Sequence, residues 1–406
     1  MKRISILVSI AILTQNLYAD ELSELKEQVQ KLQLQSDALV EEMLDISTGN
    51  FTKIDDTKAH NGMGAAASKV YYSSSELSIG GYGEMFIAKK NGDKAYTDIY
   101  RFIPYFGYRL SPWVIMNTEL EFEHGDTSKG GKVLVEFMYL DFLFNKKANI
   151  RVGNLLVPMG ITNLRHEPTL FGTVLRPYTE RYLIPSTWHE SGALLYGKIA
   201  NDRVEYTAGI INALNMANAD IDSNTWIKSA RIGSAKNGAF SPAFVARVDY
   251  ETNSFLVGGS LYYGDGSNSK DDITGTTMSI FELHALYNYT NLSLKALYTE
   301  ANLHKASKID QNATSGAQAL YVSIAYNIAD LIAIDNKLII FGLYENYNLA
   351  RYKADGSSRQ AISKYNIGVN FFPTDQSVLK LDYETVDDPN NDQLDNTIYA
   401  SYGFLF

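Results

Sequence analysis

The chain has 406 residues, of which 45% are hydrophobic and 20% are charged, and its formal net charge is −10 at pH 7. Such an acidic chain lacks the basic surface that nucleic-acid phosphates require, so we expect no nucleic-acid partner. The absence of cysteine excludes a disulfide scaffold, a thiol nucleophile and a cysteine-ligated metal. Six scattered histidines offer no metal-ligand spacing, and we therefore expect no metal and no cofactor.

The first nineteen residues have the pattern of a secretory signal peptide. Lys2 and Arg3 precede a short apolar run over residues 4–13, and Ala19 supplies the small residue expected at a cleavage position. The apolar run is too short to span a bilayer, and no later stretch reaches about 18 apolar residues. The sequence predicts an exported protein without a transmembrane helix.

Residues 20–47 have the apolar spacing of a short coiled coil. Apolar side chains recur at alternating steps of three and four, and the positions between them are mostly charged or polar. The seam consists of Leu22, Leu25, Val29, Leu32, Ser36, Leu39, Met43 and Ile46. We expect a self-associating helix, with packing of the same helix elsewhere as the alternative. Residues 48–76 show no sustained period and are expected to form a flexible linker.

From residue 77 to residue 406 the apolar period changes to two, which indicates β-strands. Tyr100, Phe102 and the even-numbered residues up to Leu110 form one apolar face, whereas Arg101 and Arg109 lie on the other. A soluble sandwich would also alternate in this way. The candidate strands, however, are about 10 to 13 residues long, as tilted membrane-crossing strands require, and aromatic residues gather at the ends of their apolar faces.

Connections between the candidate strands alternate in length along the chain. The short ones lie near residues 111–112, 145–147, 201–202, 251–253, 290–291, 329–335 and 373–376, and the long ones near 91–95, 124–132, 157–190, 215–240, 264–276, 302–316, 349–360 and 385–396. Seven short and eight long connections give sixteen strands. The sequence thus predicts an all-β fold: a transmembrane antiparallel β-barrel of about sixteen strands in the outer membrane of a Gram-negative bacterium, with its termini and N-terminal helix in the periplasm.

A barrel of this size leaves a water-filled lumen lined by inward polar side chains. The alternation places charges of both signs on that face, and their field would act on solutes. The candidate pore-lining residues are Arg101, Arg109, Glu119, Glu121, Arg151, Arg247 and Lys295. For each of them, a salt bridge within the wall is the alternative role.

The connection over residues 157–190 is far longer than a hairpin requires, and it is rich in apolar residues and proline. We expect it to fold inward and narrow the pore; an external loop packed over a neighbouring subunit is the alternative. Its candidate constriction residues are Arg165, His166, Glu167, Arg176, Glu180 and Arg181.

The same region carries a set of short motifs. They are Pro158-Met159-Gly160, His166-Glu167-Pro168, Phe171-Gly172, Arg176-Pro177 and Ile184-Pro185-Ser186-Thr187-Trp188-His189-Glu190-Ser191-Gly192. Over residues 150–197 the chain resembles the phosphate-selective porin family of Gram-negative bacteria. The resemblance implies a trimer of barrels, each narrowed by its third external loop, with Pro158, Gly160, Pro168, Pro177, Pro185 and Trp188 as structural residues. The family's phosphate selectivity rests on inward arginines and a lysine cluster, whereas this loop mixes arginine with glutamate and contains no lysine.

The chain ends on Phe406, which follows apolar residues at every second position. This end resembles the C-terminal recognition strand of outer-membrane barrels, which implies the barrel-assembly machinery as a partner; a buried edge strand is the alternative. The expected function is passive diffusion of small hydrophilic solutes or inorganic ions through a pore embedded in outer-membrane lipid. An anion-selective or phosphate-selective channel is the runner-up, and an outer-membrane enzyme or an envelope tether represents other classes. We expect no catalytic residue.

Overall fold

The computed structural model describes residues 25–37, 54–55, 58–128, 130–219, 226–234, 241–267, 273–391 and 393–406. The chain divides into two units, residues 1–53 and residues 54–406. In the first unit, residues 25–37 form a helix whose residues are all exposed, including Leu25, Val29 and Leu32 of the predicted seam. The predicted signal peptide and the remainder of the seam lie outside the described residues, apart from Ser36. Self-association of the helix stays a prediction.

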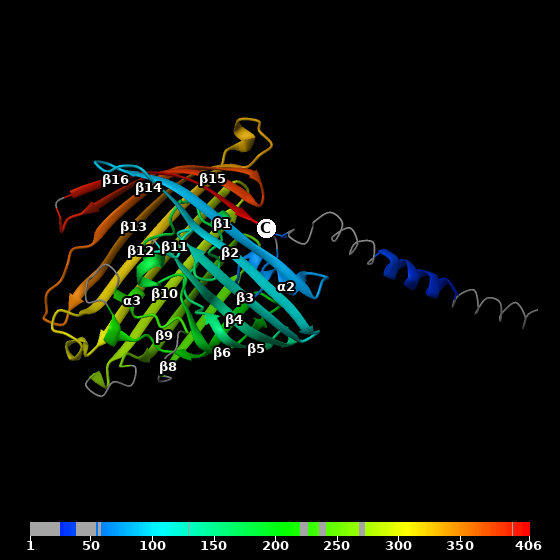
Figure 1. The fold of residues 1–406 in the computed structure, drawn as a ribbon, viewed down its shortest axis with the longest axis horizontal. Helices are drawn as coiled ribbons and strands as arrows, with labels where there is room; N and C mark the ends of the chain where they lie inside the picture. The colour runs from blue at the N-terminus through cyan, green and yellow to red at the C-terminus, as the bar shows by residue number, and fades with distance from the viewer. Residues whose placement is uncertain are drawn as a thin grey trace, which may run out of the picture. The chain divides into compact units, whose positions relative to one another are not determined.

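In the second unit, a closed β-barrel of sixteen antiparallel strands pairs each strand with its sequence neighbours, and β1 with β16 (Figure 1). The predicted barrel, its strand number and the short N-terminal helix are confirmed. The strands are β1 (Leu77–Lys90), β2 (Tyr96–Ser111), β3 (Val114–Glu123), β4 (Lys132–Asn145), β5 (Ala148–Leu156), β6 (His189–Ile199), β7 (Val204–Asn212), β8 (Pro242–Glu251), β9 (Phe255–Asp265), β10 (Thr277–Tyr289), β11 (Leu292–His304), β12 (Thr314–Asn327), β13 (Leu338–Lys353), β14 (Ile362–Thr374), β15 (Ser377–Asp388) and β16 (Gln393–Leu405).

Short helical segments lie between some strands and before β1. They are α2 (Ala65–Tyr72), η2 (Pro168–Leu170), η3 (Thr179–Leu183), η4 (Met216–Asn218), α3 (Trp226–Ser229), η6 (Ala306–Lys308) and η7 (Ala329–Leu331). Among the described residues, no helix has the length and apolar character needed to cross a bilayer.

Apolar and polar side chains alternate along each strand of the barrel wall, so that they lie on opposite faces. On β15, for example, Leu379 and Leu381 are 50% and 55% exposed, whereas Lys380 and Asp382 between them are buried. Because successive side chains of a strand point to opposite faces, this pattern gives an apolar exterior and a polar interior.

The two ends of the barrel differ in their connections. The end that carries the connections 112–113, 146–147, 200–203, 252–254, 290–291, 328–337 and 375–376 is called the short-turn end, and the other the long-loop end. Phe406 lies at the short-turn end, where its N–H donates to the carbonyl of Gly81 (3.0 Å) and its carbonyl accepts from the N–H of Gly81 (2.8 Å). Its ring stacks on Phe102, so the last residue helps to close the barrel.

Register shifts interrupt the pairing of several strands, and two of them, in β2 and β4, are β-bulges that change which side chains face inward. Glu84 pairs with Arg101, but its neighbour Met85 pairs with Ile99, so Tyr100 is an extra residue in β2. Its ring packs against the buried Phe86 on the inner side, which corrects the prediction that Tyr100 lies on the apolar outer face. The second bulge, in β4, has Glu136 as its extra residue. Bulges re-aim side chains in this way at the cost of local pairing.

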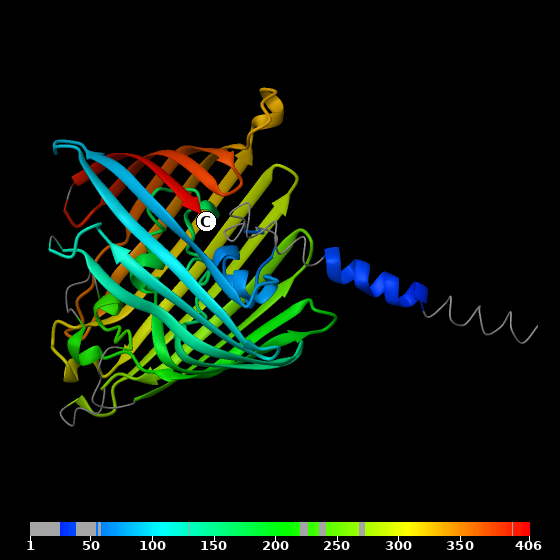
Figure 2. The ribbon, with the colours of Figure 1, turned by 45° about the vertical axis from the view of Figure 1, so that its right-hand side comes forward.

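Residues 58–76 differ from the expected flexible linker, because they contain α2 and pack against the inner wall. The helix contacts β1, β2 and β3, and Figure 2 shows it in blue within the outline of the barrel. The side-chain amide of Asn117 donates to the carbonyl of Ala67 (2.9 Å), and the Tyr71 hydroxyl donates to Asp141 (2.6 Å). A short segment without an apolar period of its own is ordered here by side chains of the wall.

Candidate functional site

The segment between β5 and β6, residues 157–188, is called the inner loop because it bonds to inward-facing side chains across the barrel. Glu345 on β13 accepts hydrogen bonds from the backbone N–H groups of Tyr178 and Thr179, both at 2.9 Å. Asp382 on β15 accepts from the N–H of Val174 (2.8 Å). Backbone N–H groups inside a barrel need acceptors, and these carboxylates supply them.

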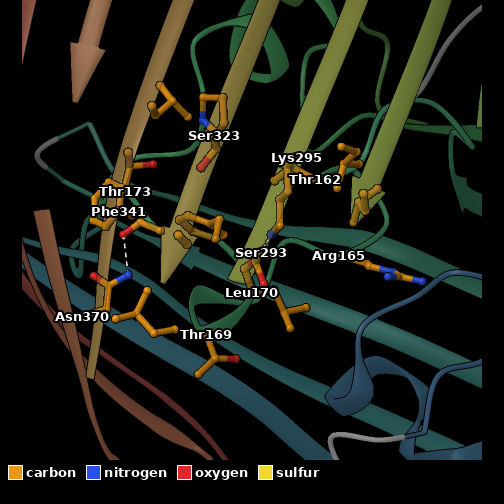
Figure 3. A pocket seen from close by; sticks show the side chains of 18 of the residues that line it. Thr162, Arg165, Thr169, Leu170, Thr173, Ser293, Lys295, Ser323, Phe341 and Asn370 are labelled. Carbon is orange, nitrogen blue, oxygen red and sulfur yellow. Dashed lines mark hydrogen bonds between the residues drawn. The ribbon is translucent and has the colours of Figure 1, made fainter. Parts of the chain in front are cut away.

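Lysine and asparagine side chains of the wall bind the carbonyl groups of the inner loop. Lys380 donates to the carbonyl of Thr173 (2.9 Å), and Lys295 donates to the carbonyl of Leu170 (2.7 Å). Asn370 donates to the carbonyl of Gly172 (2.9 Å), shown as a dashed line in Figure 3. The inner loop is therefore held from β11, β14 and β15 as well as by the carboxylates.

Glu180 holds the first turn of the inner loop from within. Its carboxylate accepts from the N–H groups of Ile161 (2.5 Å) and Thr162 (2.7 Å), and from the Tyr321 hydroxyl on β12 (2.8 Å). Gly160, with φ +71°, leaves the room for this carboxylate, because a Cβ there would lie 2.5 Å from Glu180 Oε1.

The inner loop also contacts the segment before β1. Glu167 accepts from the N–H groups of Ala66 (3.0 Å) and Ala67 (3.2 Å) in the first turn of α2, where a negative charge is favoured. The Nε of Arg165 donates to the carbonyl of Gly62 (3.0 Å). The inner loop and residues 58–76 are thus joined by hydrogen bonds, and together they occupy part of the barrel interior.

The six predicted constriction residues fall into two groups. His166, Glu167, Arg176 and Glu180 are each at most 2% exposed. Arg165 and Arg181 keep part of their surface exposed. Of the six, Arg165 and Arg181 are therefore the ones with side-chain surface left open, whereas the other four are buried within the inner loop and its contacts.

A cavity of about 320 Å³, called the loop cavity, lies between the inner loop and the short-turn ends of β10 to β14. Figure 3 shows Arg165, Lys295 and several hydroxyl groups around it. Its polar lining residues are Thr162, Arg165, Thr169, Thr173, Asn288, Ser293, Lys295, Tyr321, Ser323, Lys337 and Asn370. The described residues that line it include three cations and no acidic residue, and Glu180 lies behind Thr162 and Tyr321, whose hydroxyl groups donate to its carboxylate. Arg165 also lines a second cavity, beside Lys198 and Glu205.

The predicted pore-lining residues of the wall are mostly engaged in ion pairs. Arg151 lies 2.9 Å from Asp141, and Arg247 lies 2.8 Å from Asp249. Arg101 lies 3.0 Å from Glu121. These contacts match the alternative role, in which the inward charges neutralise one another.

Two further members of that set bind other groups. Arg109 donates to the carbonyls of Val70 (3.1 Å) and Ser73 (3.2 Å) near the end of α2. Glu119 is fully buried, and its Oε1 lies 3.2 Å from Nε2 of His166. Of the seven predicted residues, Lys295 is the one that lines the loop cavity.

The motif residues of the inner loop are packed in its core. Trp188 is fully buried, its ring centroid lies 5.1 Å from that of Tyr262, and its backbone N–H donates to the side-chain oxygen of Asn163 (2.6 Å). The Pro185 carbonyl accepts from Arg231 (2.9 Å). Pro158, Pro168 and Pro177 are buried as well. These contacts agree with a structural role for the motif.

Sequence reasoning missed Glu345 and Lys337. Glu345 lies in the middle of β13 and Lys337 directly precedes that strand, but neither belongs to a motif. Their roles depend on the path of the inner loop, which pairs Glu345 with residues more than 160 positions earlier in the chain. From the sequence, only the alternation of the strand indicated that Glu345 faces the barrel interior.

This chain is similar to known proteins in sequence and in fold. No family model matches the chain. A protein of Aquifex aeolicus (strain VF5), described as "Uncharacterized protein", is 32% identical over 365 residues, which is 85% of this chain and 83% of the relative.

Several solved outer-membrane proteins share the fold at low sequence identity. The anion-selective porin from Comamonas acidovorans has a TM-score of 0.55 and 11% identity, covering 81% of this chain and 99% of its own. The outer membrane channel DcaP of Acinetobacter baumannii has a TM-score of 0.54 and 12% identity, covering 81% and 97%. The trimer form of OmpT, an outer membrane protein of Vibrio cholerae, has a TM-score of 0.52 and 12% identity, covering 81% and 99%. The chain belongs to the same family as the Aquifex aeolicus protein, and its barrel has the fold of outer-membrane porins.

Proposed function

We propose that the protein is an outer-membrane porin, a water-filled channel for passive diffusion of small hydrophilic solutes and ions. The observation that carries this proposal is the closed barrel of sixteen strands with an apolar exterior and a polar interior. A barrel of this size is wider than its own side chains fill, and its apolar outer face suits lipid. The proposed membrane-spanning part is residues 77–406, and residues 1–19 are a signal peptide.

The inner loop is the proposed selectivity element. It is held by Glu345, Asp382 and Lys380 of the wall, so its position is fixed rather than set by the solute. Transport through such a pore depends on its width and on the field of the charges that remain exposed, without any bond chemistry. Arg165 and Arg181 are the constriction residues that retain exposure.

A preference for anions is the second proposal, and it rests on the loop cavity. Arg165, Lys295 and Lys337 line this cavity without an acidic residue among its described lining residues, and Thr169 adds a hydroxyl group. Cations and hydroxyl donors together replace the hydration shell of an anion. The anion selectivity stated for the Comamonas acidovorans porin supports the same direction. Phosphate is one candidate solute within this proposal.

The sign of selectivity is measured in planar bilayers across a potassium chloride gradient. We expect the reversal potential to lie toward the chloride equilibrium potential, and Arg165→Gln to move it toward zero. The matched control is Lys146→Gln, which removes a cation from the exposed 146–147 turn, where the Lys146 side chain is 82% exposed. A wild-type reversal potential on the potassium side would refute the anion preference and leave the porin. Block of the chloride current by added phosphate would favour a phosphate pathway.

We also propose that the barrel assembles as a homotrimer, with the N-terminal helix in the periplasm. Leu25, Val29 and Leu32 lie exposed on that helix at the spacing of a coiled-coil seam. The trimer form of Vibrio cholerae OmpT, which has the same barrel fold, is consistent with this assembly. Phe406 at the end of the last strand is the proposed signal for the barrel-assembly machinery.

A further inference from the structure

Two carboxylates and a histidine meet in a buried cluster inside the barrel. Glu119 on β3, Glu136 on β4 and His166 on the inner loop each offer one ligand atom, and the three atoms lie within 4.8 Å of one another. Glu119 and Glu136 are fully buried and His166 is 2% exposed. The two strands are neighbours, but His166 comes from a segment that crosses the barrel, so the cluster joins the inner loop to the wall.

The β4 bulge aims Glu136 into this cluster. Glu119 pairs with Phe137, whereas Leu120 pairs with Val135, which leaves Glu136 as the extra residue. Glu136 and Phe137 are both fully buried, although neighbouring side chains of a regular strand point to opposite faces. The bulge therefore adds a carboxylate to the inner face beside Glu119.

The orientation of the His166 ring presents its Nε2 to the two carboxylates. Nδ1 lies 3.0 Å from the carbonyl oxygen of Asn163, which only accepts, so Nδ1 carries the proton. Nε2 lies 3.2 Å from Glu119 Oε1, and the Tyr105 hydroxyl is 3.4 Å away, longer than usual for a hydrogen bond. A histidine that binds a metal through one ring nitrogen commonly donates from the other to a backbone carbonyl in this way.

The carboxylates of the cluster lack partners. Within the described part of the chain, no donor group is bonded to either oxygen of Glu136 or to the Oε2 of Glu119, and Glu136 joins no ion pair. The two carboxyl groups face each other, so without a cation they can hydrogen-bond only by sharing a proton. Arg176 lies in the same region, but its Nη2 donates to the Tyr82 hydroxyl (3.2 Å) and to the His166 carbonyl (3.1 Å). A buried, unpartnered carboxylate is costly, and a cation among these three ligands would satisfy it.

The spacing suits a divalent transition metal. Metal–ligand distances of about 2.0–2.2 Å put neighbouring ligand atoms roughly 3 to 3.5 Å apart, which the His166–Glu119 contact already matches. One imidazole nitrogen with two carboxylates is a ligand set that zinc accepts. We propose that Glu119, Glu136 and His166 form a buried divalent-metal site, best suited to zinc, and that the bound ion clamps the inner loop to β3 and β4. This proposal is independent of what passes through the barrel.

A second histidine cluster provides the matched control. On the facing wall, His284 has Nδ1 2.7 Å from Glu282 and Nε2 3.2 Å from Asp249, so both ring nitrogens already face carboxylates. It is buried like His166, and Arg247 lies beside it. Replacement of His284 removes a comparable buried imidazole without touching the proposed site.

The test is zinc binding to the full-length folded protein, purified without a histidine tag, stripped with a chelator and dialysed against zinc chloride. We expect one tightly held zinc per chain, with affinity reduced at least about 100-fold in Glu136→Gln and His166→Gln, because even outer-shell changes cost about 10- to 100-fold. His284→Gln should keep the wild-type affinity. Zinc should also raise the thermal midpoint of the wild type and of His284→Gln only.

Heat-modified gel mobility identifies folded barrels among the variants, and Glu119→Gln replaces any variant that does not fold. Wild-type protein that binds no more zinc than folded His166→Gln, including after refolding with zinc present, would overturn the proposal. Equal loss of zinc in His284→Gln and His166→Gln would also overturn it, because the site would then lie elsewhere.

Discussion

Replacement of Glu345 by alanine should release the middle of the inner loop from the wall. Glu345 accepts three hydrogen bonds from the loop: from the N–H groups of Tyr178 and Thr179 and from the Thr179 hydroxyl (3.0 Å). Hydrogen bonds to a charged group contribute about 1.5–3 kcal/mol each, so their loss weakens docking by roughly 4 kcal/mol or more. At about 1.4 kcal/mol per factor of ten, a loss of roughly 4 kcal/mol makes the released loop about a thousandfold more populated. Asp382 and Asn370 still hold part of the loop, so we expect at least a tenfold rise.

Cysteine labelling measures this population directly, because the chain contains no cysteine of its own. Val174→Cys introduces a thiol at a position that is 3% exposed, and a maleimide should react with it slowly in the otherwise wild-type protein. In the Glu345→Ala background the rate should rise at least tenfold. Glu300→Ala is the control, because Glu300 accepts two hydrogen bonds from its own strand and none from the inner loop. A folded Glu345→Ala barrel with an unchanged labelling rate would refute the account of how the loop is held.

Three other perturbations test separate parts of the structure. Gly160→Ala should lower the thermal midpoint more than Gly356→Ala does. Both glycines have positive φ, but only at Gly160 would the new Cβ lie 2.5 Å from a carboxylate oxygen. Equal shifts of the midpoint would show that the contact with Glu180 does not require a glycine. Burial lowers the pKa of Lys228 to about 8, from an ordinary value of about 10.4. The folded state therefore has its full stability above about pH 10.4, where Lys228 is neutral, and loses part of it as the pH falls through about 8 and the side chain becomes charged. Lys228→Met should therefore have a higher thermal midpoint than the wild type at pH 7, with the difference vanishing above about pH 10, and a constant difference would contradict this. Deletion of residues 20–47, with the signal peptide retained, should weaken the trimer on native gels while the barrel still conducts. Loss of conductance in a folded barrel would contradict the view that the N-terminal helix serves only assembly or tethering.

The strands and their order follow from the sequence because the barrel wall depends on a local rule. Each strand must present apolar side chains to one face, as Leu379 and Leu381 do against Lys380, and the turns interrupt that pattern. The rule fails where a bulge adds a residue. Tyr100 therefore turned inward against expectation, since nothing in its neighbours' polarity marks the extra residue.

The interior was less predictable, because its contacts join distant parts of the chain. The sequence located the inner loop and its charged residues, but not which of them would be buried. Arg165 stays partly exposed beside the loop cavity, whereas the adjacent His166 turns toward Glu119. Likewise α2 has no strong pattern of its own, and its order comes from wall residues such as Asn117.

Single-channel recording in planar lipid bilayers tests the central claim most directly. The purified, folded protein should insert to give discrete steps of conductance in potassium chloride, and heat-denatured protein should give none. With trimers, voltage-induced closures should come in three equal sub-steps, one for each barrel. Folded trimers that insert into the bilayer but conduct no ions would contradict the assignment of this barrel as a porin.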